Sequence, residues 1–91
     1  MNKQRRKALD EIHTNILKAV DLLNEAKDDL EDVRSEEEEA RDNMPESLQE
    51  SERCEQMSEI VDTLEEQEYE LENAIDTLES VLGELWDIIE G

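Results

Sequence analysis

The sequence is poor in the residues from which most globular folds build their cores and turns. Of 91 residues only Tyr69 and Trp86 are aromatic, Phe is absent, and there are two glycines and one proline. So few aromatic side chains argue against a conventional core with a deep substrate pocket. So few glycines and prolines argue against a β fold rich in turns. The single cysteine, Cys54, cannot form an internal disulfide, and a reducing cytoplasm is the expected compartment.

Positive charge is also scarce, and long hydrophobic runs are absent. The chain carries 29 acidic and 9 basic residues, which gives a formal net charge of −20. A charge this negative argues against direct contact with nucleic acid or with an anionic membrane. No segment approaches the roughly 18 consecutive apolar residues of a membrane span. The basic residues between Lys3 and Lys7 are followed by the mixed segment 8–11 rather than by an apolar stretch, so we do not expect a secretory signal.

Apolar residues recur with helical spacing through most of the chain. The steps alternate between three and four residues, and only Glu37 and Gln67 interrupt the two series, which together comprise 21 positions. This heptad pattern predicts two long helices that pack along a coiled-coil seam. The predicted seam residues are Leu9, Ile12, Ile16, Ala19, Leu23, Ala26, Leu30, Val33, Glu37, Ala40 and Met44, followed by Met57, Ile60, Leu64, Gln67, Leu71, Ala74, Leu78, Val81, Leu85 and Ile88.

A break between the two series predicts a turn. Pro45 cannot lie in the interior of a helix, and it disfavours helical backbone in the residue before it. The segment 47–50 has the form of a capping box that restarts a helix, and Ser51 is an alternative start. We therefore predict a single all-α domain over 1–91, an antiparallel two-helix coiled-coil hairpin. Its expected parts are helix one at about 5–43, a linker at about 44–50 and helix two at about 51–89.

The predicted apolar stripe widens toward the chain termini, where two helices alone would leave part of it in water. One interpretation is a homodimer that forms a four-helix bundle at this end. A second is a docking face for a different protein, and a third is that the hairpin twists enough to cover the stripe itself. The residues assigned to this oligomer or docking face are Leu17, Val20, Leu22, Ile75, Leu82, Trp86 and Ile89.

Residues that could support catalysis or hold a metal are few and far apart. His13 and Cys54 are the only histidine and cysteine, and the predicted hairpin places them near opposite ends, which excludes a Cys-His nucleophile pair. Asp10 and His13 have the spacing of a carboxylate–histidine metal pair, but metal sites in bundles need several inward carboxylates, and this seam is apolar. We therefore expect no enzyme activity, no catalytic residues, no metal site and no cofactor.

Negative charge is concentrated in the second half of the chain. Residues 43–91 hold 16 acidic residues and a single basic one, Arg53. Ordinary coiled coils mix both signs on their outer faces, because like charges one turn apart are destabilising. The excess acid either keeps a small protein soluble or imitates the charge of nucleic acid toward a basic DNA- or RNA-binding protein. The candidate residues for binding that partner are Glu59, Asp62, Glu65, Glu66, Glu72, Asp76 and Glu79.

The linker, set between acidic heptads, resembles that of small acidic coiled-coil proteins encoded by bacteriophages and other mobile elements of bacteria. The residues that carry the resemblance are Pro45, Glu46, Ser47, Leu48, Gln49, Ser51, Glu52, Arg53 and Met57. Small acidic phage proteins include anti-CRISPR and anti-restriction inhibitors, some of which are DNA mimics. The resemblance therefore implies an inhibitor of a nucleic-acid-directed defence protein in the host bacterial cytoplasm, and it carries over no functional residue. The alternative is a structural scaffold or oligomerisation module that works through the apolar end.

Overall fold

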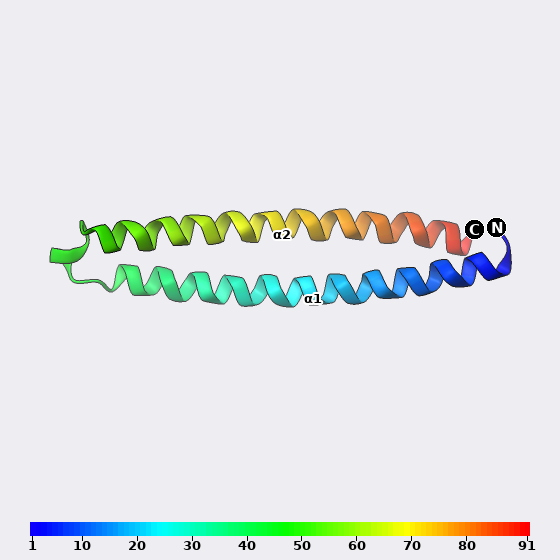
Figure 1. The fold of residues 1–91 in the computed structure, drawn as a ribbon, viewed down its shortest axis with the longest axis horizontal. Coiled ribbons are helices and arrows are strands. Elements are labelled where there is room, and N and C mark those ends of the chain that lie inside the picture. The colour runs from blue at the N-terminus through cyan, green and yellow to red at the C-terminus, as the bar shows by residue number, and fades with distance from the viewer.

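Two long antiparallel helices make up nearly the whole molecule. The computed structural model describes residues 1–91. Helix α1 runs over Lys3–Asp42 and α2 over Glu52–Glu90, and a short 3-10 turn, η1 (Glu46–Leu48), lies in the connection. The chain doubles back there, so both termini lie at the same end of a rod of 70 × 15 × 14 Å (Figure 1). The predicted all-α fold class is confirmed. Neither helix contains a stretch long and apolar enough to cross a membrane.

Local sequence explains where the helices begin. Asn2 caps α1, because its Oδ1 accepts a hydrogen bond from the backbone N–H of Arg5 at 2.8 Å. Ser51 caps α2 in the same way, and its Oγ accepts from the backbone N–H of Cys54 at 3.3 Å. The alternative start at Ser51 is therefore the one used. Pro45 lies between the helices with φ −54° and ψ 141°, where its missing N–H interrupts no helical hydrogen bond.

The cap of α2 gives a first testable result. Replacing Ser51 by alanine should lower the free energy of unfolding by about 1 kcal/mol, because the backbone N–H of Cys54 would lose its acceptor. Ser51→Asp should keep most of the stability, since a carboxylate can accept the same bond. Urea unfolding followed by circular dichroism measures both changes. Equal stabilities of the alanine variant and the parent chain would contradict this description of the turn.

The observed seam between the helices agrees with the predicted seam in only one of its two rows of residues on each helix. The other predicted row is replaced by the row of residues that follows it by one position. Val20, Val61, Ile75 and Leu82 are buried, with Val61 only 2% exposed. Each follows by one position a residue of the predicted seam, and those predicted residues are exposed on the surface. The predicted residues that lie outside the seam are Ile12, Ala19, Ala26, Val33 and Ala40 on α1, and Ile60, Gln67, Ala74, Val81 and Ile88 on α2.

Side-chain size accounts for the replacement around the core cluster. Val20, Ile75 and Leu82 are each larger than the residues that precede them in the chain, Ala19, Ala74 and Val81, so burying them removes more apolar area from water. Val61 is smaller than Ile60 before it, so size does not account for the burial at that position. The predicted seam is therefore wrong in this half of its residues. It is correct for the central stripe, in which leucines such as Leu23 and Leu78 are half-buried against the core.

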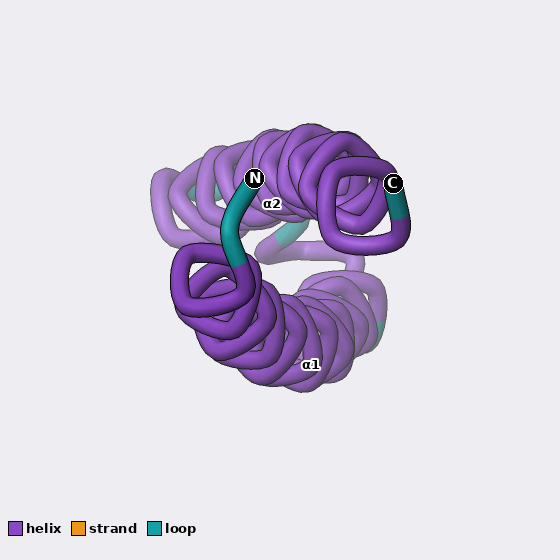
Figure 2. Tube along the Cα trace, turned by 90° about the vertical axis from the view of Figure 1, so that its right-hand side faces the viewer, coloured by secondary structure: helices purple, strands orange, loops and turns teal.

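The largest core cluster lies in the half of the rod nearer the termini. Val20, Ile75 and Leu82 form it, and Ile16, Leu23 and Leu78 pack against it. Val20, Ile75 and Leu82 were expected on the outward oligomer or docking face, and that assignment is wrong, because all three are buried between the helices. Figure 2 shows how the two helices wind about each other along the rod. Of the remaining members of that face, Leu17, Leu22 and Trp86 are exposed and Ile89 is half-buried.

Candidate functional site

The seam divides the surface of the hairpin into two long sides, and one of them holds the ion pairs between the helices. Lys27 Nζ lies 3.9 Å from Glu72 Oε2, and Arg34 Nη1 lies 3.8 Å from Glu65 Oε1. We call this the paired side. A shallow groove on it is lined from both helices by Lys27, Glu31, Arg34, Glu65, Glu68, Tyr69 and Glu72.

Arg34 is the centre of the paired side. Its Nε donates to Glu68 Oε2, and its Nη1 donates to Glu38 Oε2 at 3.0 Å. The hydrogen bond to Glu68 raises the pKa of Arg34 above its ordinary value, partial desolvation opposes this rise, and the charges of Glu68, Glu38 and Glu65 add to it. A raised pKa stabilises the fold below the unfolded-state pKa, and the contribution is lost only as the pH rises through the folded-state pKa. Arg34 therefore adds no pH dependence to stability near neutrality.

The Arg34–Glu68 pair gives a second testable result. Arg34→Met should lower the melting temperature, because the Glu68 side chain is only 13% exposed and would keep its charge without a counterion. Arg34→Met combined with Glu68→Met should recover most of that loss, since both charges are then gone. Lys27→Met is the control, because Lys27 pairs at 3.9 Å with the exposed Glu72 and should matter less. Thermal unfolding measures all four melting temperatures. A double variant that melts no higher than Arg34→Met alone would contradict the pairing of Arg34 with Glu68.

The only histidine and cysteine lie near opposite ends of the rod. The imidazole of His13 and the indole of Trp86 have centroids 5.4 Å apart and planes tilted by 42°. Cys54 is a free, buried thiol in the first turn of α2, next to the linker. His13 therefore packs against the indole of Trp86, and Cys54 packs in the interior near the linker. No group of three or more His, Cys, Asp or Glu side chains has a geometry that could hold a metal ion.

The seven acidic residues predicted to bind a partner are all exposed on α2, but they do not form one uniform face. Glu65 and Glu72 lie on the paired side next to Arg34 and Lys27, which partly neutralise them. Sequence reasoning missed this, because the predicted seam left Arg34 on the surface. The other five make no ion pair, and we call them the outer acidic residues: Glu59, Asp62, Glu66, Asp76 and Glu79.

The opposite side of the hairpin has a different character. On each helix, two rows of residues flank the central seam residues, such as Leu23. Residues three positions after a central residue, such as Ala26, lie toward one long side of the hairpin, and residues four positions after it, such as Lys27, lie toward the other. Because the helices are antiparallel, the rows that contain Lys27 and Glu68 both lie toward the paired side, and the two rows that contain Ala26 and Gln67 share the opposite side. Its ten residues, Ile12, Ala19, Ala26, Val33, Ala40, Ile60, Gln67, Ala74, Val81 and Ile88, define what we call the neutral side.

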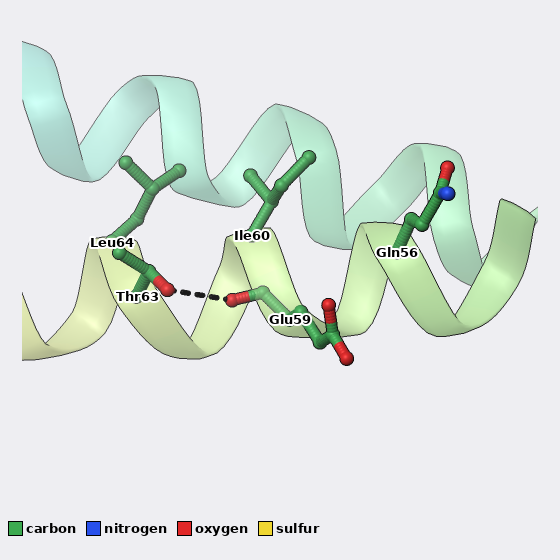
Figure 3. Close-up of a pocket in the computed structure, with 5 residues that line it drawn as sticks. All are labelled: Gln56, Glu59, Ile60, Thr63 and Leu64. Atoms are coloured by element: carbon green, nitrogen blue, oxygen red, sulfur yellow. Dashed lines mark hydrogen bonds between the residues drawn. The ribbon is translucent and has the colours of Figure 1, made fainter.

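None of these ten residues is charged, in a chain in which 42% of residues are. A shallow depression on this side is lined by Gln56, Glu59, Ile60, Thr63 and Leu64. Figure 3 shows Ile60 and Leu64 directed to the same side of α2 as the neighbouring helix, while the carboxylate of Glu59 points away. The hairpin therefore exposes two surfaces of different character, the acidic exterior of α2 and the neutral side.

No protein-family model matches this chain, and no curated protein or solved structure matches it either.

Proposed function

We propose that this chain is a non-enzymatic interaction module that binds a basic, nucleic-acid-binding groove of another protein through the acidic exterior of α2. The observation that carries the proposal is the nearly uniform negative charge of one continuous helix. Within Glu52–Glu90 there are 14 acidic residues and one basic residue, Arg53. A groove lined by lysine and arginine is the surface that complements such a helix.

The spacing of the charge supports imitation of nucleic acid. On a rod 70 Å long, 29 acidic residues provide one carboxylate per about 2.4 Å, and the net charge of −20 is one charge per 3.5 Å. B-DNA presents one charge per about 1.7 Å of its axis. The protein rod is therefore within about a factor of two of the charge density of DNA.

The outer acidic residues suit this role better than the rest. They have no counterion within the chain, so binding a cationic partner breaks no internal ion pair. Their helix is already formed, so the carboxylates pair with lysine and arginine without the cost of ordering the backbone. The kind of partner that fits is a DNA- or RNA-binding defence protein of a bacterial cytoplasm, which the chain would inhibit by occupying its groove.

Capture from bacterial lysate tests this proposal. The immobilised chain should retain nucleic-acid-binding proteins at low salt and release them at about 0.5 M salt, because screening shortens the range of charge interactions. Duplex DNA added at constant low salt should release the same proteins by competition. Retained proteins that neither treatment releases would contradict the proposal.

The second candidate function is a scaffold or oligomerisation module that forms a homodimeric four-helix bundle. The observation that favours it is the neutral side, on which large apolar side chains stay in water. The two candidates are separable, because assembly through an apolar surface should persist at high salt, whereas binding through carboxylates should not.

A further inference from the structure

We propose that the neutral side binds a second copy of this chain, and that the two hairpins pack antiparallel along their whole length as a four-helix rod. The inference rests on the second candidate function, oligomerisation, and is independent of the first. It differs from dimerisation through the terminal end alone, because the neutral side extends from Ile12 and Ile88 at one end to Ala40 and Ile60 at the other.

The exposure of the neutral side is the first support. Its five large side chains are between 38% and 53% exposed, although each lies beside the core rather than on the far side of its helix. They are Ile12, Val33, Ile60, Val81 and Ile88. The alanines between them are small, which allows another helix to approach closely.

The heptad pattern is the second support. Each helix carries two overlapping apolar series that share the central stripe, and a lone hairpin uses only one of them. In a four-helix bundle each helix contacts two neighbours and needs a correspondingly wider apolar face. The series through Ala19 and Val33 has the fewest polar interruptions, yet its outer residues are exposed in the single hairpin. A helix that forms a second seam with another copy is expected to show this pattern.

The available area agrees with a stable dimer. From Ile12 to Ala40 the neutral side is about 42 Å long at a rise of 1.5 Å per residue. With the 15 Å width of the rod it covers about 600 Å², so two copies would bury about 1,300 Å² in total. Interfaces of this size are typical of stable dimers. A small peptide would leave most of the neutral side exposed, whereas a second copy matches its length and its lack of charge.

Charge determines the orientation. Four basic residues lie within Lys3–Lys7 at the terminal end, and four consecutive acidic residues, 36–39, lie near the linker. The terminal end also holds Glu84, Asp87 and Glu90, which offset its basic segment, so the linker end is the more acidic of the two. A parallel pair of hairpins would place the two acidic segments together. An antiparallel pair places the acidic segment of each copy beside the basic segment of the other, so attraction replaces that repulsion.

Molar mass measured by sedimentation equilibrium tests the interface. The parent chain should be a dimer of about 21 kDa, twice the 10.6 kDa of one chain. Ile12→Asp combined with Val81→Asp should weaken dimerisation at least a hundredfold, because the new carboxylates would be buried against the second copy. The control is Leu17→Asp, which removes a side chain of similar exposure, 44% against 48% for Ile12, from the paired side and should leave the dimer intact.

Distances between spin labels in the undisturbed interface test the arrangement without relying on those variants. With Cys54→Ala to remove the native thiol, a label at Gln4→Cys should give a distance between copies on the order of 60 Å, the length of the 40-residue helix α1. A parallel pair would give about 20 Å, two helix diameters.

Each outcome has a distinct meaning. A monomeric parent chain would overturn this inference together with the oligomerisation candidate. A dimer that resists Ile12→Asp with Val81→Asp but dissociates with Leu17→Asp would overturn this inference alone. The short label distance would overturn the antiparallel arrangement.

Discussion

Replacing Val20 by aspartate should unfold the hairpin, whereas the same replacement at Val33 should leave it folded. Val20 is 5% exposed within the core cluster, and Val33 is 53% exposed on the same helix. A carboxylate at Val20 would be buried without a counterion at a cost of at least about 3 kcal/mol. That cost is a large part of the roughly 5–15 kcal/mol that stabilises a typical domain. At Val33 the new charge stays in water and should cost less than about 1 kcal/mol in the monomer.

Circular dichroism and urea unfolding measure this contrast. The protein concentration should be low enough to keep the chain monomeric, because Val33 belongs to the neutral side and its substitution would also affect a dimer. The two positions have the same side chain and the same helix, so propensity differences cancel. Loss of structure with Val33→Asp but not with Val20→Asp would show that the seam follows the heptad series of the sequence instead.

Neutralising the five outer acidic residues with Gln and Asn should weaken binding to the captured basic partner by about a hundredfold. That loss corresponds to about 2.7 kcal/mol, or roughly half a kcal/mol for each charge removed from a partly screened interface. The same variant should unfold at a higher temperature, because like charges on neighbouring turns of α2 repel one another. Binding and stability should therefore change in opposite directions.

The control for this experiment removes five acidic residues from exposed positions of α1. They are Glu11, Asp21, Glu25, Asp32 and Glu39. Both variants have the same net charge, so a general effect of charge would reduce binding equally in the two. Calorimetry with the captured partner should show the larger loss for the α2 variant. Equal losses would contradict a binding surface on α2.

The two-helix fold could be predicted from the sequence because several signals agree. Heptad spacing on both sides of Pro45 requires two helices and a turn, and Ser51 supplies a cap for the second. The central leucine stripe was also predictable, since residues such as Leu23 and Leu78 belong to both possible apolar series.

The choice between the two series could not be predicted from continuity of apolar residues alone. The series through Ala19 and Val33 has fewer polar interruptions than the series through Val20 and Arg34, so the pattern favours it. The hairpin instead buries Val20 and accepts Arg34 in the seam, where Glu68 satisfies its charge. A count of interruptions gives weight neither to side-chain volume nor to an ion pair between residues 34 positions apart.

The same error affected the candidate binding residues. Glu65 and Glu72 were predicted to be free carboxylates, yet α1 supplies Arg34 and Lys27 beside them. Val20 was predicted on the outer face for the same reason. Both errors have one cause. Relative to the prediction, each helix is rotated about its own axis, so residues expected to face water face the other helix, and residues expected to face the other helix face water.

Methyl nuclear Overhauser contacts in the monomeric chain test the position of the seam most directly. The structure predicts that the methyl groups of Val20 contact those of Ile75 and Leu82, with Ile16 packed against the same group, and that Val81 shows weaker contacts to α1 than Leu82 does. Contacts between Ile16 and Val81, with none from Val20 to α2, would contradict the seam and with it the division of the rod into a paired and a neutral side.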